Sequence, residues 1–147
     1  MWFRAHRRCN ACNRQRNAMV KFELLMRQEG NVLCAELNGQ RSPLQPEMAR
    51  HSQETWDAIL WECQVLGLSR VLVVSRLTGW LSSAAVYSTV SYLEQNVPTS
   101  VEKIAYVDLN PQTMPFNAFG QRIAGQRGRP IAVFDNEADA RAWLANP

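Results

Sequence analysis

Apolar residues alternate or run continuously in five short segments, and these segments predict strands. Residues 20–26 and 31–39 flank the turn signal Gly30–Asn31, which predicts an antiparallel hairpin. Three further strands are expected over 70–77, 103–109 and 130–135. The segments 70–77 and 103–109 are almost continuously apolar and rich in β-branched residues, which is typical of central strands covered on both faces. The chain therefore predicts one sheet with the hairpin at one side.

A long helix is predicted after the hairpin. Pro46 or Glu47 opens it, since proline suits the first helical turn, and it ends near Leu66. Gly67 follows as a left-handed C-terminal cap. Residues at spacings of three and four form one face of this helix. They are Met48, Ser52, Trp56, Ile59, Cys63 and Leu66.

Three more helices alternate with the remaining strands. One runs from about Ser82 to Gln95, with Ala85 or Val86, Val90 and Leu93 as its buried stripe. A loop and helix then hold Phe116, Phe119 and Ile123 at helical spacing. The last helix covers 137–146 and is capped by Asn136 or Asp135.

The element order is ββαβαβαβα, which defines the expected fold class. Strands that alternate with helices predict an α/β fold with a mostly parallel sheet and right-handed crossovers. The sheet should hold about five strands, with the N-terminal hairpin as its antiparallel part. A length of 147 residues fits one such domain with an adequate core.

Charge separates the first 18 residues from the rest. Five of the 16 Lys and Arg residues lie in 1–18, which contain no acid. The rest of the chain contains the other 11 Lys and Arg residues and all 13 Asp and Glu residues. We therefore expect a basic, flexible extension over 1–18, or an upstream stretch included by the choice of start codon, and a single domain over 19–147. The slightly acidic domain is not expected to bind nucleic acid.

The apolar runs and the cysteines of the chain predict its cellular compartment and its metal content. No stretch approaches the roughly 20 apolar residues that span a bilayer, and no apolar segment follows the basic N-terminus, so a cytoplasmic protein is expected. Cys34 and Cys63 are expected to be buried thiols. Cys9 and Cys12 with His6 could form half of a zinc site, but structural zinc needs four ligands, and we expect no metal and no cofactor.

The segment from Leu77 to Ser83 is the first candidate site for a ligand or partner. It follows a central parallel strand, where open α/β sheets bind ligands. Gly79 allows close backbone approach, Trp80 offers an apolar surface, and Ser82 and Ser83 lie where a helix N-terminus attracts anions. The alternative is that Ser82 only caps the helix.

Asp108 and Asn110 form the second candidate site, at the exit of the next strand. Both side chains could bind a polar ligand at the same edge of the sheet. The alternative is that they form a turn, since Asp and Asn before proline are common turn residues.

Several stretches resemble the SpoIIAA-like proteins, relatives of the STAS domain of anti-sigma-factor antagonists. The resemblance covers about 20–144 and depends on the hairpin, "RVLVVSRLTGW", "KIAYVDLNP" and "AVFDNEADARAWL". It implies a STAS-like fold and a serine at a helix start that a partner kinase phosphorylates. Ser82 and Ser83 are near that position, but 78–82 lacks the acid that usually precedes the serine.

No catalytic constellation is visible in the sequence. The two histidines, His6 and His51, have no identifiable nucleophile beside them, and there is no phosphate-binding glycine loop. The expected function is a non-enzymatic regulatory or binding module that acts through a protein partner or a small apolar ligand. One alternative is a small enzyme with its site at the strand exits near Gly79 and Asp108. Another is a structural, homodimer-forming subunit, because Trp56 and Trp61 cannot both face inward from one helix.

Overall fold

The computed structural model describes residues 2–4, 21–41, 45–79, 82–113, 115, 117, 118, 121, 122 and 131–147. Its centre is one sheet in which the strands lie in chain order. The strands are β1 (Phe3–Arg4), β2 (Lys21–Glu29), β3 (Val32–Gln40), β4 (Arg70–Thr78), β5 (Lys103–Asp108) and β6 (Ile131–Phe134). The pairs β1–β2 and β2–β3 are antiparallel, and β3–β4, β4–β5 and β5–β6 are parallel. The predicted α/β fold, with a parallel sheet and an antiparallel hairpin, is confirmed.

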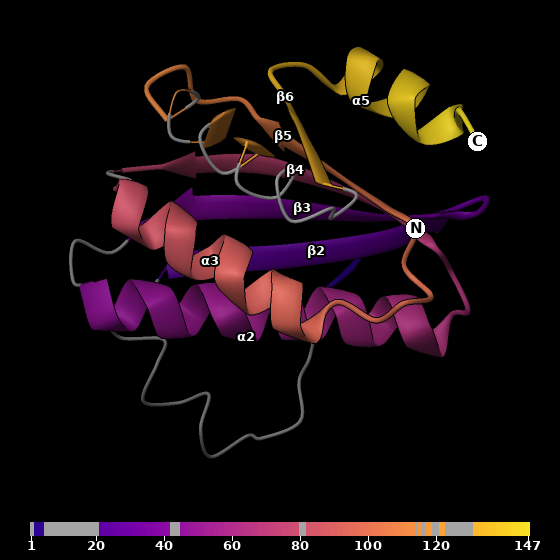
Figure 1. Ribbon diagram of the computed structural model, residues 1–147, viewed down its shortest axis with the longest axis horizontal. Coiled ribbons are helices and arrows are strands. Elements are labelled where there is room, and N and C mark those ends of the chain that lie inside the picture. Colours follow the sequence, from indigo (N-terminus) through magenta and orange to yellow (C-terminus); the bar gives the residue numbers. More distant parts are fainter. Residues whose placement is uncertain are drawn as a thin grey trace.

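Three described helices cover the two faces of the sheet. They are α2 (Gln45–Val65), α3 (Ser83–Asn96) and α5 (Glu137–Ala145). Figure 1 shows α2 and α3 side by side on one face and α5 on the other. A helix was also expected around Phe116, Phe119 and Ile123, and these three residues lie outside the described part of the chain. Their described neighbours are helical: Asn117, Ala118, Gln121 and Arg122.

Both faces of the central strands are buried, as their continuous apolar runs predicted. On β4, Val71 and Val73 pack into the core beneath α2 and α3, and Leu72 and Val74 pack beneath α5. All four are at most 6% exposed. This alternation follows from the two-residue repeat of a strand.

The long helix follows its predicted face with one difference. Trp56, Ile59 and Cys63 are buried in the core. Leu66 was expected on the same face, but the helix ends at Val65 and Leu66 is 37% exposed. Gly67 has φ +67, which confirms the left-handed cap, and the amide of the next residue donates to the Cys63 carbonyl at 2.9 Å.

Two residues of the N-terminal segment that was expected to be a flexible extension pair with the sheet, and the division of the chain between residues 18 and 19 stays a prediction. Phe3 and Arg4 pair with Met26 and Leu25 and add β1 to the sheet. This pairing is possible because the outer edge of β2 offers backbone hydrogen-bonding groups. A second contact holds the segment, since the Arg27 guanidinium stacks 4.2 Å from the centre of the Trp2 ring. Residues 5–20, with Cys9, Cys12 and His6, lie outside the described residues.

Candidate functional site

The carboxyl edge of the parallel strands brings two distant turns together. β3 ends at Gln40 and β4 at Thr78, and these residues are partners in the register. The amide of Arg41 donates to the Thr78 carbonyl at 2.8 Å, which extends the ladder by one bond. Arg41 therefore leaves β3 directly beside the turn at Gly79.

Gly79 is required at this turn by both its conformation and its surroundings. Its φ is +100, which L side chains rarely adopt, and a Cβ there would lie 3.2 Å from both the N and the O of Arg41. The close approach that the sequence predicted at Gly79 is thus an approach to the protein's own backbone. Gly79 fixes where Arg41 lies.

Arg41 is a buried cation. It is 6% exposed, and its Nη1 has no hydrogen-bond partner in the described part of the chain. Buried arginine is nearly always paired, because an unpaired charge in a low-dielectric site is costly. Arg41 shares a side-chain hydrogen bond with Tyr106 but leaves its Nη1 unpaired among the described residues, so it is the first group in this region to consider for a ligand.

A polar cluster lies in the sheet on the same face as Arg41. Ser75 on β4 and Asp108 on β5 are register partners, and both are at most 2% exposed. Asp108 accepts hydrogen bonds from the Asn110 amide at 2.9 Å, and from the side chains of Thr113 and Asn117. Three neutral donors thus hold the carboxylate, and Asp108 anchors the loop that follows β5.

Tyr106 connects this cluster with Arg41. Burial raises the pKa of the Tyr106 hydroxyl, the Arg41 charge and a hydrogen bond with Ser75 oppose that rise, and the Asp108 charge adds to it. The net shift of the pKa is upward. Tyr106 is therefore a neutral phenol at physiological pH, able to donate a hydrogen bond.

A cavity of about 110 Å³ lies between this face of the sheet and the helices α2 and α3. Most of its lining is apolar: Phe22, Leu37, Ala49, Trp56, Leu77, Ala85, Val86, Val90, Leu93 and Ile131. Its polar lining consists of Arg41, Ser52, Thr55, Thr89, Tyr106 and Asn117. Among the described residues that line it, the cavity is thus mainly apolar with one cation.

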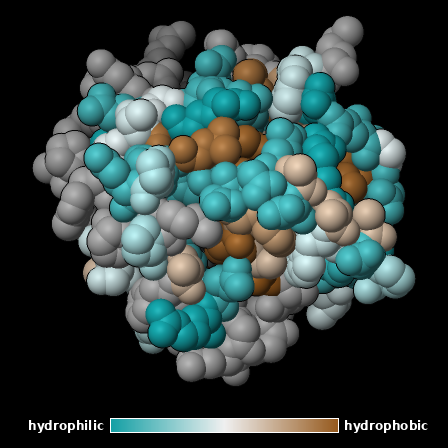
Figure 2. All heavy atoms as spheres, turned by 90° about the horizontal axis from the view of Figure 1, so that it is seen from above, coloured by the Kyte–Doolittle hydropathy of each residue, from teal (hydrophilic) through white to brown (hydrophobic). Residues whose placement is uncertain are grey.

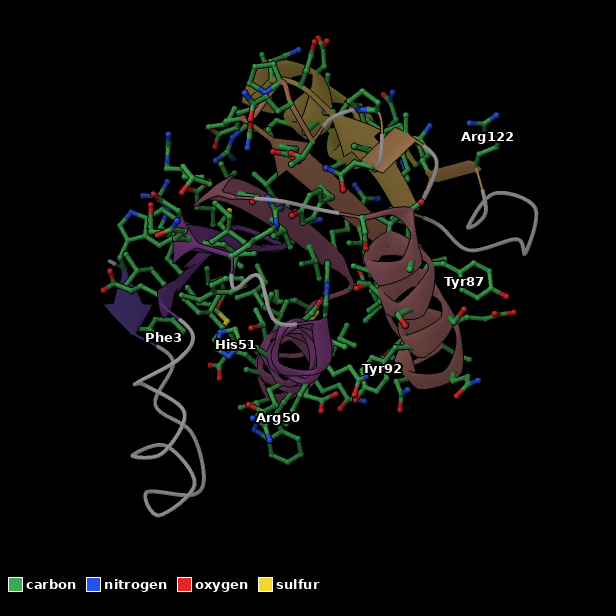
Figure 3. The ribbon with its side chains drawn as sticks, turned by 90° about the vertical axis from the view of Figure 1, so that its left-hand side faces the viewer. Phe3, Arg50, His51, Tyr87, Tyr92 and Arg122 are labelled. Carbon is green, nitrogen blue, oxygen red and sulfur yellow. The ribbon has the colours of Figure 1, made fainter. Side chains whose placement is uncertain are left out.

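The polar groups on the helix side of the cavity have partners. The hydroxyls of Ser52 and Thr89 lie 3.2 Å apart and join α2 to α3, and Thr55 Oγ1 donates to the His51 carbonyl at 2.8 Å. Figure 3 looks at the molecule from the end where both helices begin, with Tyr92 between them and Tyr87 turned outward. The hydroxyls of Ser52, Thr55 and Thr89 on the helix side are therefore bonded to the chain itself.

A second hollow lies outside the strand exits. Gly79 and Asn110 line it together, with Arg76, Leu77, Thr78, Leu109, Pro111 and Gln112. Asn110 Oδ1 accepts from the Gln112 amide at 3.0 Å, and Arg76 Nε donates to Glu36 at 2.9 Å. No acid, histidine or cysteine is among the described residues that line it. The predicted strand-exit residues are brought together, but their polar groups bond to the chain itself.

Ser82 and Ser83 have different environments at the start of α3. Ser82 is the N-cap, and its hydroxyl accepts from the Ala85 amide at 3.0 Å. Ser83 is the first residue of the helix and is exposed. The capping alternative is therefore seen for Ser82, while phosphorylation of either serine stays a prediction. Trp80 lies outside the described residues.

The two described thiols are buried. Burial raises the pKa of Cys34 to about 11, to which the charge of Glu29 adds, and burial alone raises that of Cys63 to about 11. Neither thiol is a thiolate at neutral pH, so neither is suited to nucleophilic chemistry. In the described part of the chain, no group of three His, Cys, Asp or Glu side chains is arranged to hold a metal ion.

Exposed apolar side chains are scattered outside the cavity. Trp56 is buried and Trp61 is 47% exposed, as expected from their spacing. Val65 and Leu66 are also exposed at the end of α2. Figure 2, which views the molecule from above, shows hydrophobic atoms only as separate patches between hydrophilic ones. Homodimer formation therefore stays a prediction. Among the described residues, no helix is long and apolar enough to cross a bilayer.

Sequence reasoning missed Arg41 and Tyr106. Arg41 lies in "NGQRSP", a polar stretch with every sign of an exposed loop, and Tyr106 lies in a strand where an aromatic residue is ordinary. One signal was present: Arg41 comes directly after a strand that leads into a parallel crossover. That is the sheet edge at which α/β proteins bind ligands.

Comparisons with known proteins give one distant likeness. No protein-family model matches the sequence, and no curated protein matches it significantly. A solved structure from Shewanella loihica PV-4, described as an uncharacterised DUF3478-family protein with a SpoIIAA-like fold, is similar at 12% sequence identity. The match covers 84% of this chain and 94% of that chain, with a TM-score of 0.45.

Proposed function

We propose that this chain is a non-enzymatic binding module that takes a small, mainly apolar ligand into the cavity between the sheet and α2 and α3. The cavity itself supports the proposal. Native cores contain few voids larger than a water molecule, because an unfilled space loses packing energy. A space of about 110 Å³ with a mainly apolar lining has the character of a ligand site, and it is smaller than the roughly 300–1,000 Å³ of sites for drug-sized molecules, so the ligand must be small.

A regulatory role would act through α3. Ala85 and Val86 of this helix line the cavity, while Ser83 and Tyr87 of the same helix are exposed on the outside. A ligand that packs against the inner face of α3 would change the stability and position of the helix. A protein partner that contacts the outer face would sense that change.

Binding of benzene tests the proposal. A dry apolar cavity of about 150 Å³ in another protein admits benzene, so a slightly smaller and partly polar one is a fair comparison. We expect benzene to raise the thermal unfolding midpoint, because a ligand that binds only the folded state stabilises it. Shifts of methyl NMR signals from Val86 and Val90 should locate the ligand.

Two alanines on α3 give a matched pair of variants. Ala85 lines the cavity and Ala84 is exposed, so Ala85→Leu fills the space and Ala84→Leu does not. We expect benzene to stabilise Ala84→Leu as it stabilises the wild type, and to leave Ala85→Leu unchanged. Equal stabilisation of both variants, or none of the wild type at saturating benzene, would overturn the proposal.

A further inference from the structure

The cavity contains a cation that the chain leaves only partly satisfied. Arg41 lines it, is 6% exposed, and has no hydrogen-bond partner for Nη1 among the described residues. A guanidinium is always charged at physiological pH, so it cannot avoid the cost of burial by losing a proton. An anion in the cavity would pair with it.

From this we infer that the ligand is a small carboxylate whose apolar part fills the cavity and whose carboxylate binds Arg41. The inference rests on the proposed function and names its ligand class. A guanidinium matches a carboxylate in geometry, since its planar donors can bond both oxygens. The neutral hydroxyl of Tyr106, which also lines the cavity, is a second donor for the same group.

The charges around the cavity favour a monoanion over a phosphate. Arg41 is the one charged side chain among the described residues that line it. Asp108 lies close enough for its charge to act on Tyr106, and its carboxylate is held by neutral donors. Arg41 and Asp108 carry opposite single charges, so a bound monoanion leaves one net negative charge near the cavity, whereas a dianion would leave two, which is more costly.

The size of the cavity favours a small molecule over a lipid. About 110 Å³ is less than the 150 Å³ or so that admits benzene elsewhere, so the apolar part is at most one ring or a short aliphatic chain. The carboxylate of the ligand should point toward Arg41 and away from the helices, because Ser52, Thr55 and Thr89 on the helix side already have hydrogen-bond partners.

Paired ligands and paired variants test the inference on the full-length chain. Benzoate and benzamide have nearly the same shape and differ in charge. We expect calorimetry to show benzoate binding at least about tenfold more tightly than benzamide to the wild type, as suits one charge-assisted hydrogen bond. In Arg41→Met that preference should disappear, and in Arg41→Lys it should be partly kept.

Arg76→Met is the matched control, because Arg76 lies at the same edge of the sheet but outside the cavity. It should keep the benzoate preference of the wild type. Benzene binding by Arg41→Met shows that this variant is folded with its cavity intact.

The failures of the two proposals are distinguishable. If benzene binds but benzoate binds no better than benzamide, the carboxylate inference is wrong and the binding module stands. The carboxylate inference is equally wrong if phenyl phosphate binds more tightly than benzoate, or if Arg76→Met loses the preference and Arg41→Met keeps it. If benzene does not bind the wild type at saturation, the proposed function itself is wrong.

Discussion

Replacing Gly79 by alanine should destabilise the protein far more than the same change at another glycine with positive φ. At Gly79 the φ of +100 lies beyond the ordinary left-handed region, and the new Cβ would meet backbone atoms of Arg41 at 3.2 Å. Real Cβ atoms are rarely so close to a neighbour, and these neighbours belong to a paired strand end that cannot rotate away.

The size of the effect follows from two contributions. A strained backbone conformation costs about 1–3 kcal/mol, and overpacking costs about 1–3 kcal/mol more, so the loss should be about 2–6 kcal/mol. Gly30 provides the control, because its φ is +58 and nothing lies within 4 Å of an added Cβ. Gly30→Ala should cost only about 1 kcal/mol, the penalty for a left-handed alanine.

Urea unfolding of the two variants measures the difference. The midpoint should fall much further for Gly79→Ala, with an unchanged slope if the unfolded state is unaffected. Because Gly79 fixes Arg41, the same variant should also lose its preference for benzoate and keep its binding of benzene. Equal losses of stability at Gly79 and Gly30 would refute the reasoning from close approach.

Two further predictions concern the cap of α3 and an ion pair beside α5. Ser82→Ala should cost about 1 kcal/mol of unfolding free energy, because it removes the bond to the Ala85 amide, while Ser83→Ala should stay within about 0.5 kcal/mol. Equal effects in urea unfolding would contradict the capping role. Burial alone would raise the pKa of Glu29, but hydrogen bonds and charge from Arg141 hold it below its ordinary 4.5. The ionised Glu29 therefore stabilises the fold above that pH and loses this effect as the pH falls. Arg141→Met removes the ion pairs of Arg141 with both Glu29 and Glu137, and because these side chains are partly exposed it should cost below about 1 kcal/mol at pH 7 and nothing near pH 2. A cost independent of pH would show that these ion pairs are not responsible.

The central strands could be predicted because a strand that is buried on both faces has a continuous run of apolar residues. The run from Val71 to Val74 is continuously apolar since alternate residues pack beneath opposite layers of helices. The ends of strands were predicted less well. β2 continues past Met26 through Arg27, Gln28 and Glu29, which pair along β3 although they are polar. Backbone pairing does not depend on hydropathy, so polar strand ends have no hydrophobic signal.

The short strand β1 could not be predicted for a related reason. Phe3 and Arg4 pair with only two residues of β2, and so short a segment has no alternation to detect. Its pairing depends on an edge that exists only once the hairpin has formed. The same applies to Arg41, whose burial is produced by contacts between segments far apart in the chain.

The predicted strand-exit segment and the cavity are parts of one structure. Gly79 packs against the backbone of Arg41, and Ser82 begins the helix whose Ala85 and Val86 form one wall of the cavity. The segment was expected to bind a ligand through its own backbone and hydroxyls. In the structure Gly79 packs against the backbone of a buried cation and Ser82 caps a helix of the cavity wall, while ligand binding by the segment itself stays a prediction. A modification or partner that moves this segment would therefore change the cavity, because the residues that hold Arg41 and start α3 would move together.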